Sequence, residues 1–147
     1  MEESLKSATS FPETDPTPIF ELFRGSHATE ILVAAVCHLN VFDRMADGPL
    51  GWTELKEHTG LAERPMVVLV TALQAMGLLE KDDSGSYSPT PIAREHLGVG
   101  AGFGVDGYLG LAAESPGVLD FVERLRSNKP RGAEDPETGA AFIFKEG

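Results

Sequence analysis

Apolar residues recur at steps of three and four along residues 62–77, which is the spacing of an amphipathic α-helix. The apolar positions of this stretch are Met66, Leu69, Val70, Leu73 and Met76. Pro65 falls in the first turn, where a missing backbone N–H costs no hydrogen bond, and Gly77 follows where the helix should end. The pattern predicts a helix that buries one face in the core.

The segments on either side of this helix complete a known arrangement. Thr53 is placed to cap a short preceding helix, residues 54–59, with its hydroxyl group. Beyond the long helix, residues 78–81 and 86–88 have strand character, and residues 82–85 carry turn-forming side chains between them. Two helices followed by a β-hairpin predict a winged helix. The chain is therefore expected to be mainly α: a winged helix with a small β-hairpin wing plus additional N- and C-terminal helices.

A second apolar pattern predicts a helix over residues 26–39. Ala28, Ile31, Leu32, Ala35, Val36 and Leu39 form one apolar face at helical spacing. Val33, Ala34 and Cys37 fill much of the other side, and a helix that is apolar nearly all round must be covered from two sides. We expect a second copy of the chain to supply part of that cover, with a fully central helix in a monomer as the alternative. The residues expected at a dimer interface are Phe20, Phe23, Ile31, Val33, Val36 and Cys37.

Composition predicts where the folded part begins and ends. Residues 1–17 hold Ser, Thr, Pro and Glu with few apolar anchors, and are expected to form a disordered leader. The winged-helix domain is expected over residues 18–129. Residues 130–147 read as a linker rich in Pro, Gly and acidic residues, followed by the apolar stretch 140–144. We expect the natural protein to continue beyond this point into a further domain.

The net charge of −11 argues against nucleic acid as a partner. Residues 18–97 alone carry six basic and eleven acidic side chains, so the expected core is acidic. Nucleic-acid binding draws most of its affinity from Lys and Arg, and this charge argues against it. No apolar run reaches membrane-spanning length, and no signal peptide is present at the start of the sequence. Cys37 is the single cysteine, which fits a cytoplasmic protein.

The expected recognition helix also lacks the side chains that read DNA. Its outer face offers Val67, Val68, Thr71 and Gln74, with Arg64 as the sole cation. The tip of the wing carries Asp82 and Asp83, which would repel phosphates. These features favour protein contact, and a winged-helix transcription regulator is kept as the alternative function.

No catalytic, metal-binding or cofactor-binding constellation emerges from the sequence. Residues 102–107 match G-x-G-x-x-G, but the polar, helical residues 92–97 precede them, and the motif needs a buried strand there. We expect this segment to connect two helices, and a self-sufficient enzyme using the 98–107 loop is the weaker alternative. The four histidines lack ligand spacing, and the side chains of Cys37 and His38 diverge on a helix.

The order of several short motifs resembles a known module. Leu-Asn-Val-Phe-Asp at 39–43, Thr-Glu-Leu at 53–55, the segment 72–80 and Tyr-Ser-Pro-Thr at 87–90 follow one another as they do in that module. Over about residues 18–130 the chain resembles the N-terminal dimerisation domain of S-adenosylmethionine-dependent small-molecule O-methyltransferases. Pro89 stands where that family usually has Leu, so the returning strand should be short or at an edge.

The resemblance implies what the chain does. In that family the domain pairs two subunits and helps to line the partner's substrate pocket, while a separate domain binds S-adenosylmethionine and carries the catalytic His. We therefore expect a homodimer that contributes to a pocket for a small-molecule methyl acceptor. The catalytic domain, with its S-adenosylmethionine, is expected to be absent from this chain, which alone should be inactive.

Overall fold

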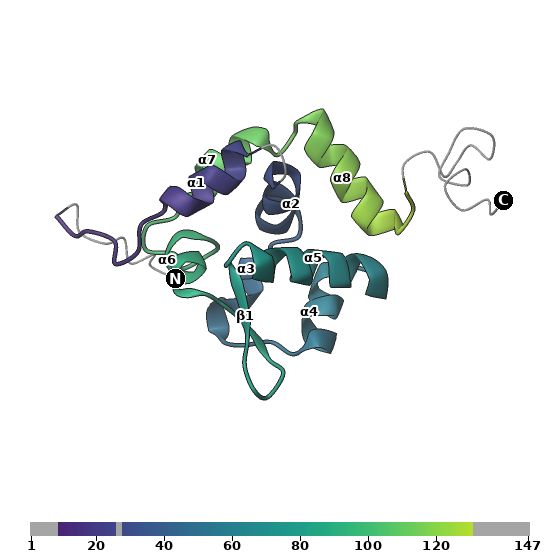
Figure 1. Ribbon diagram of the computed structural model, residues 1–147, viewed down its shortest axis with the longest axis horizontal. Coiled ribbons are helices and arrows are strands. Elements are labelled where there is room, and N and C mark those ends of the chain that lie inside the picture. The colour runs from purple at the N-terminus through teal and green to yellow at the C-terminus, as the bar shows by residue number, and fades with distance from the viewer. Residues whose placement is uncertain (1–8, 26–27, 131–147) are drawn as a thin grey trace.

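The computed structural model describes residues 9–25 and 28–130 of the chain (Figure 1). Residues 1–8 of the expected leader lie outside this description. Residues 131–147, which hold the expected linker after Pro130 and the start of the expected further domain, also lie outside it. The described residues form eight α-helices, one two-stranded antiparallel sheet and short π- and 3₁₀-helical turns. In chain order these are α1 (Thr17–Arg24), α2 (Thr29–Val33), the π-helix η1 (Ala34–His38), α3 (Val41–Arg44), η2 (Met45–Asp47), α4 (Trp52–Thr59), α5 (Glu63–Ala75), β1 (Leu79–Lys81), β2 (Tyr87–Pro89), α6 (Pro91–His96), α7 (Asp106–Leu109), η3 (Gly110–Ala112) and α8 (Pro116–Ser127).

The predicted winged helix is confirmed in α4, α5 and the β1–β2 hairpin. The long helix α5 buries Met66, Leu69, Val70 and Leu73 as its apolar spacing predicts, while Met76 at its end is half-buried. Leu79 pairs with Pro89 at the end of the three-residue strand β2. The strand is therefore short, as expected from a proline that cannot donate to the ladder.

Helix α4 begins two residues earlier than the sequence suggests, at Trp52 rather than Glu54. Thr53 was expected to precede the helix as its cap, but it lies within α4, and Gly51 is the residue before the first turn. The backbone N–H of Gly51 donates to the Glu54 carboxylate at 2.9 Å. The side chain of Glu54, at the third helical position, thus stabilises the start of the helix that the Thr53 hydroxyl was expected to cap.

The central helix is continuous but changes its winding. The helix expected over residues 26–39 is described as α2 followed directly by the π-helix η1, and residues 26–27 lie outside the description. The N–H of Leu39 donates to the carbonyl of Ala34 five residues earlier, at 2.9 Å. Asn40 ends the helix in the left-handed conformation, with φ of 48°. Asn tolerates that conformation better than most residues do.

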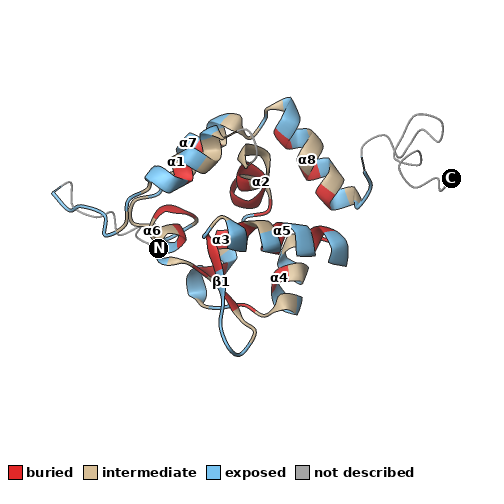
Figure 2. Cartoon of the chain, viewed as in Figure 1, coloured by how far each residue is buried: buried red, intermediate tan, exposed pale blue. Residues whose placement is uncertain are grey.

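Four helices of the same chain surround this central helix. α1, α5 and α8 contact α2, and α7 and α8 contact η1. Figure 1 shows α1 and α7 on one side of α2 and α8 on the other. The buried segments in Figure 2 converge on α2 and on the inner sides of its neighbours. The central helix is thus the middle of the hydrophobic core, and much of its apolar surface is covered from within the chain.

The segment before α1 makes hydrogen bonds to the side chain of Glu95 in α6. The backbone N–H groups of Glu13 and Thr14 each donate to the Glu95 carboxylate at 2.8 Å, and the Thr14 hydroxyl donates to it at 2.6 Å. α1 then begins at Thr17. A composition poor in apolar residues carries no sign of these bonds, because their acceptor lies about 80 residues away in the sequence. None of the helices in residues 9–25 and 28–130 has the length and apolar character needed to traverse a bilayer.

Candidate functional site

An exposed apolar surface lies where α1 meets α7 and η3. The ring of Tyr108 in α7 packs against Phe20 at a centroid distance of 5.4 Å and against Phe23 at 5.3 Å. Tyr108 is nevertheless 41% exposed, and Leu111 in η3 is 80% exposed. We call Phe20, Phe23, Tyr108 and Leu111 the α1–α7 face. A single exposed Leu needs no explanation, but an exposed Leu beside three contacting rings marks a surface suited to a protein partner.

The six residues predicted at an interface fall into two groups. Phe20 and Phe23 are half-buried on the α1–α7 face, and Ile31 and Cys37 are half-buried on the central helix. By contrast, Val33 is 0% exposed and Val36 is 7% exposed within the single chain. Val33 therefore has no surface that another molecule could contact. Val33 and Val36 could make an extensive contact with a partner only if a helix that covers them moved away.

Cys37 lies beside the α1–α7 face without reactive character. Burial raises the pKa of the Cys37 thiol, and the nearby Asp106 carboxylate raises it further. A thiol held in its protonated form is a poor nucleophile and behaves as a small apolar side chain. His38, its neighbour, directs Nε2 to the carbonyl of Ala113 at 2.9 Å. The Cys37 side chain thus acts in packing, and the His38 side chain contacts the backbone that follows η3.

Sequence reasoning missed Tyr108 and Leu111. The signal was present, because the two residues are three apart in a segment with weak helical character. Two apolar positions in a glycine-rich region do not show which side is buried. Only the packing of Tyr108 on Phe20 and Phe23 identifies the exposed side.

A groove of about 420 Å³ runs between the start of α1, the start of α2 and the end of α5. It is lined by Pro18, Glu21, Leu22, Gly25, Ala28, Ala75 and Met76. Among the described residues that line it, Glu21 alone is ionisable, and the others are apolar or small. A groove of this kind can accept a flat apolar molecule and hydrogen-bond a hydroxyl group through the Glu21 carboxylate.

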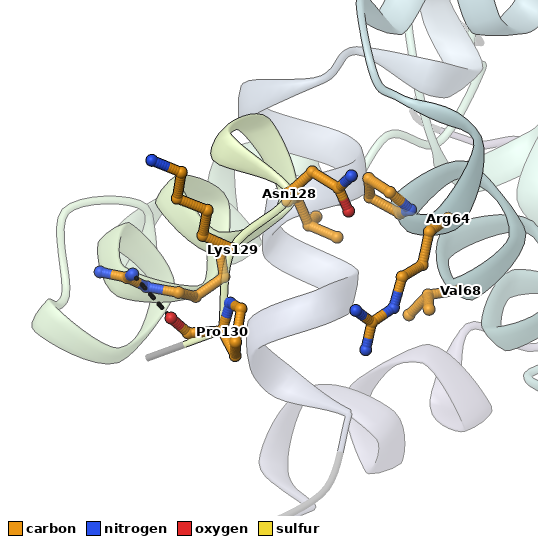
Figure 3. A pocket seen from close by; sticks show the side chains of 8 residues that line it. Arg64, Val68, Asn128, Lys129 and Pro130 are labelled. Atoms are coloured by element: carbon orange, nitrogen blue, oxygen red, sulfur yellow. Dashed lines mark hydrogen bonds between the residues drawn. The ribbon is translucent and has the colours of Figure 1, made fainter. Parts of the chain in front are cut away.

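A smaller cavity of about 150 Å³ separates the start of α5 from the end of α8 (Figure 3). Arg64 and Val68 line its α5 side, and Asn128, Lys129 and Pro130 line the opposite side. The Arg124 guanidinium also lines it and donates to the Pro130 carbonyl at 3.4 Å. The cavity carries several cations in an otherwise acidic chain.

The outer face of α5 and the wing have the character that the sequence predicts. Val67, Val68, Thr71 and Gln74 are exposed on α5. At the wing tip, the Asp82 carboxylate accepts hydrogen bonds from the Ser84 hydroxyl at 2.6 Å and from the N–H of Ser86 at 3.0 Å. These bonds lower the pKa of Asp82, so the tip keeps its negative charge to lower pH. This face presents aliphatic and anionic groups rather than the cations that phosphate contact requires.

The glycine-rich segment joins two helices, as predicted, and its backbone is held by one carboxylate from α7 and one from α3. Asp106 Oδ2 accepts the N–H of Gly98, and Asp43 Oδ1 accepts the N–H of Val99, both at 2.8 Å. The helix α6 precedes the segment, where a dinucleotide site would need a strand. Within the described residues, no group of three or more His, Cys, Asp or Glu side chains is arranged to hold a metal ion.

The fold and the sequence identify the class of protein together. Residues 20–98 match the family described as O-methyltransferase dimerisation domain, and they make up more than half of the chain. The chain belongs to this family, whose description implies that it forms a dimer. The predicted resemblance is therefore confirmed.

The chain is similar to part of several longer O-methyltransferases. It is 33% identical over 135 residues to 3-hydroxy-5-methyl-1-naphthoate 3-O-methyltransferase of Streptomyces sahachiroi, covering 90% of this chain and 38% of that relative. It is 30% identical over 139 residues to the tetracenomycin polyketide synthesis 8-O-methyl transferase TcmO of Streptomyces glaucescens, covering 87% and 41%. A crystal structure of an O-methyltransferase family 2 protein from Planctomyces limnophilus in complex with apigenin is similar, with a TM-score of 0.67 and 52% identity over 84% of this chain and 37% of that one.

The chain spans about two fifths of the length of the curated relatives it matches first. These relatives are O-methyltransferases by name, and the chain corresponds to their N-terminal part. The residues that the chain shares with them are thus those of the dimerisation domain.

Proposed function

We propose that the chain forms a homodimer through the α1–α7 face and that it lines part of the pocket for an aromatic methyl acceptor in an S-adenosylmethionine-dependent O-methyltransferase. The observation that carries the proposal is the exposed side of Tyr108 and Leu111 beside the paired rings of Phe20 and Phe23. A cytoplasmic location, expected from the single cysteine, belongs to the same proposal.

The composition of the face supports pairing with a second copy. Its four members are apolar or aromatic, and Glu21 and Arg24 are exposed on the same helix α1. An apolar centre bounded by charged side chains is the usual anatomy of a protein interface. Aromatic side chains at the centre of such a patch supply a large share of the binding free energy. Ile31 and Cys37, half-buried on the neighbouring central helix, are proposed to extend the contact.

Sedimentation velocity on the 147-residue chain tests the dimer. At about 50 μM we expect a dimer, and Leu111→Glu should shift the population to monomer because it places a charge at the centre of the interface. Val67→Glu is the matched control, since Val67 is also an exposed aliphatic residue, at 47%, but lies on α5. A wild-type chain that stays monomeric, or a Val67→Glu chain that loses the dimer equally, would contradict the proposed interface.

The groove between α1, α2 and α5 is the proposed contribution to the acceptor pocket. Its apolar lining suits an aromatic ring, and the Glu21 carboxylate can accept a hydrogen bond from a phenolic hydroxyl. The relatives' names include a hydroxynaphthoate, and the Planctomyces structure contains apigenin; both are flat hydroxylated aromatics. We propose an acceptor of this class for the enzyme that this domain serves. The methyl donor is proposed to bind outside the described residues, so the chain alone should give no heat when titrated with S-adenosylmethionine.

Saturation-transfer NMR with apigenin tests the groove separately from the dimer. We expect transfer to apigenin in the wild-type chain and its loss in Ala75→Trp, because the indole would fill the groove that Ala75 lines. Gln74→Trp adds the same side chain at the neighbouring exposed position, outside the groove lining, and should keep the transfer. Equal loss in both variants, or no transfer in wild type, would rule out the groove as an acceptor site without affecting the dimer proposal.

A further inference from the structure

His96 occupies an unusual hydrogen-bonding environment near the N-terminal segment. It is the last residue of α6, and it is 1% exposed. Its Nδ1 lies 2.9 Å from the carbonyl oxygen of Phe103, and its Nε2 lies 3.0 Å from the carbonyl oxygen of Thr14. One ring therefore joins three parts of the chain: α6, the loop before α7, and the segment before α1.

Both partners of the ring are acceptors, and this restricts its protonation state. A carbonyl oxygen cannot donate a hydrogen bond, and a neutral imidazole carries only one N–H. In a neutral ring, the lone pair of one nitrogen would point at the lone pair of a carbonyl oxygen. Because the ring is buried, water could not solvate that nitrogen instead. The doubly protonated ring is the one state that satisfies both contacts.

The charges around the ring favour a cation. On its own helix, Glu95 Oε2 lies 3.8 Å from Nε2, while the guanidinium of Arg94 donates to the Pro89 carbonyl at 2.9 Å. From the N-terminal segment, Asp15 interacts electrostatically with the ring. Residues 97–105, which supply the Phe103 carbonyl, contain no ionisable side chain. Two carboxylates thus face the buried ring.

Glu95 remains ionised across the pH range in which histidine titrates. The pKa of Glu95 is lowered chiefly by the hydrogen bond from the Thr14 hydroxyl, with the N–H of Glu13 and the charge of His96 acting in the same direction. Its hold on Glu13 and Thr14 is thus constant at neutral pH, and any change there must come from His96.

We propose that His96 is a proton-dependent latch, in which the doubly protonated ring holds the segment before α1 to α6 and to the loop before α7. When the ring loses a proton, one of its two bonds is lost and the segment is held by Glu95 alone. The segment leads directly into α1, which carries Phe20 and Phe23. The latch therefore acts on the start of the helix that bears the α1–α7 face, and it does not depend on whether that face forms a dimer.

Nitrogen NMR of the histidine rings in the wild-type chain tests the protonation state directly. Where the Glu13 and Thr14 amides are protected, we expect His96 to show two protonated ring nitrogens, and it should show a single N–H where raising the pH has released the segment. In parallel, the protection of the Glu13 and Thr14 amides against hydrogen exchange, corrected for intrinsic rates, should fall at least about tenfold as the ring loses its proton. A neutral His96 ring with these amides protected would overturn the proposal.

Three variants separate the latch from its surroundings. His96→Gln cannot change its charge, so the pH dependence of the two protected amides should disappear. Glu95→Gln should lower their protection at every pH but keep the pH dependence, because His96 is still present. His58→Gln is the matched control: His58 is exposed and directs one ring nitrogen to the Asn40 carbonyl, so both quantities should remain as in wild type. Unchanged pH dependence in His96→Gln would also reject the latch, and the wild-type ring measurement decides the matter if that variant does not fold.

Discussion

At the scale of single residues, one glycine of the glycine-rich segment, Gly98, is explained by backbone packing. Gly98 has φ of +83°, and a Cβ atom placed there would lie 2.9 Å from the backbone carbonyl carbon of Phe42. The segment can lie against α3 only because this residue has no side chain. The glycine at position 98, just before the G-x-G-x-x-G pattern of residues 102–107, therefore serves a close contact between two stretches of backbone.

Replacing Gly98 should be costly for this reason. Gly98→Ala is expected to lower the free energy of unfolding by about 2–4 kcal/mol, since it combines a left-handed backbone with a clash that backbone atoms cannot relieve. Gly100→Ala is the control, because Gly100 has φ of +87° but open space around its Cβ position, so it should lose only about 1 kcal/mol. Urea unfolding of both variants measures the difference, and equal losses would show that the contact with Phe42 contributes nothing.

Asp106 gives a pH prediction at the same scale. Burial raises the pKa of the Asp106 carboxyl, Asp43 raises it further, and the hydrogen bond from Gly98 opposes them. A carboxyl whose pKa is higher in the folded state stabilises the fold at acid pH, and that contribution is lost as pH rises through the ordinary Asp value toward the folded one. Asp106→Asn should therefore gain stability relative to wild type as the pH is raised from acid to neutral.

Thermal unfolding of both proteins across this pH range measures the effect. Asp47→Asn, at an exposed position in η2, is the control and should follow wild type at every pH. If the difference in melting temperature between Asp106→Asn and wild type stayed constant with pH, it would contradict the burial of the Asp106 carboxyl group.

At the scale of elements, the sequence patterns predicted the features that depend only on residues within one helix or one hairpin. α5, the wing and the left-handed cap at Asn40 follow from local spacing and turn chemistry. The winding of η1 and the anchoring of Thr14 to Glu95 do not, because both depend on contacts between distant segments. The interface residues illustrate the same limit: an apolar spacing includes Val33 and Val36 but cannot show that their own chain covers them.

The wing depends on the side chain of Asp82. It accepts hydrogen bonds from Ser84 and Ser86 in the turn, so Asp82→Ala should lower the melting temperature by about 3 °C at neutral pH. Because these bonds lower the pKa of Asp82, their contribution is present above the ordinary Asp pKa and is lost as pH falls through the folded one. The melting temperatures of Asp82→Ala and wild type should thus converge in acid.

Asp83→Ala is the appropriate comparison, since Asp83 is an exposed carboxylate of the same turn. Calorimetry at several pH values should show Asp83→Ala close to wild type throughout. An equal loss in the two variants would mean that wing charge, rather than the turn geometry at Asp82, determines the effect.

At the scale of the whole molecule, charge separates this winged helix from those that bind DNA. The chain has a net charge of −11, and its α5 face and wing tip carry little positive charge. We expect no measurable binding to duplex DNA in fluorescence anisotropy, even at about 50 mM salt, where phosphate contacts are strong. Binding with a steep dependence on salt concentration would instead support a regulator of transcription.

The bonds between Thr14 and Glu95 close a loop of 81 residues. During synthesis on the ribosome, the beginning of the chain must wait until α6 has left the exit tunnel before it can settle. Closing so long a loop costs entropy that few contacts repay until the winged helix has formed. The segment before α1 is translated first but therefore cannot dock until α6 has formed.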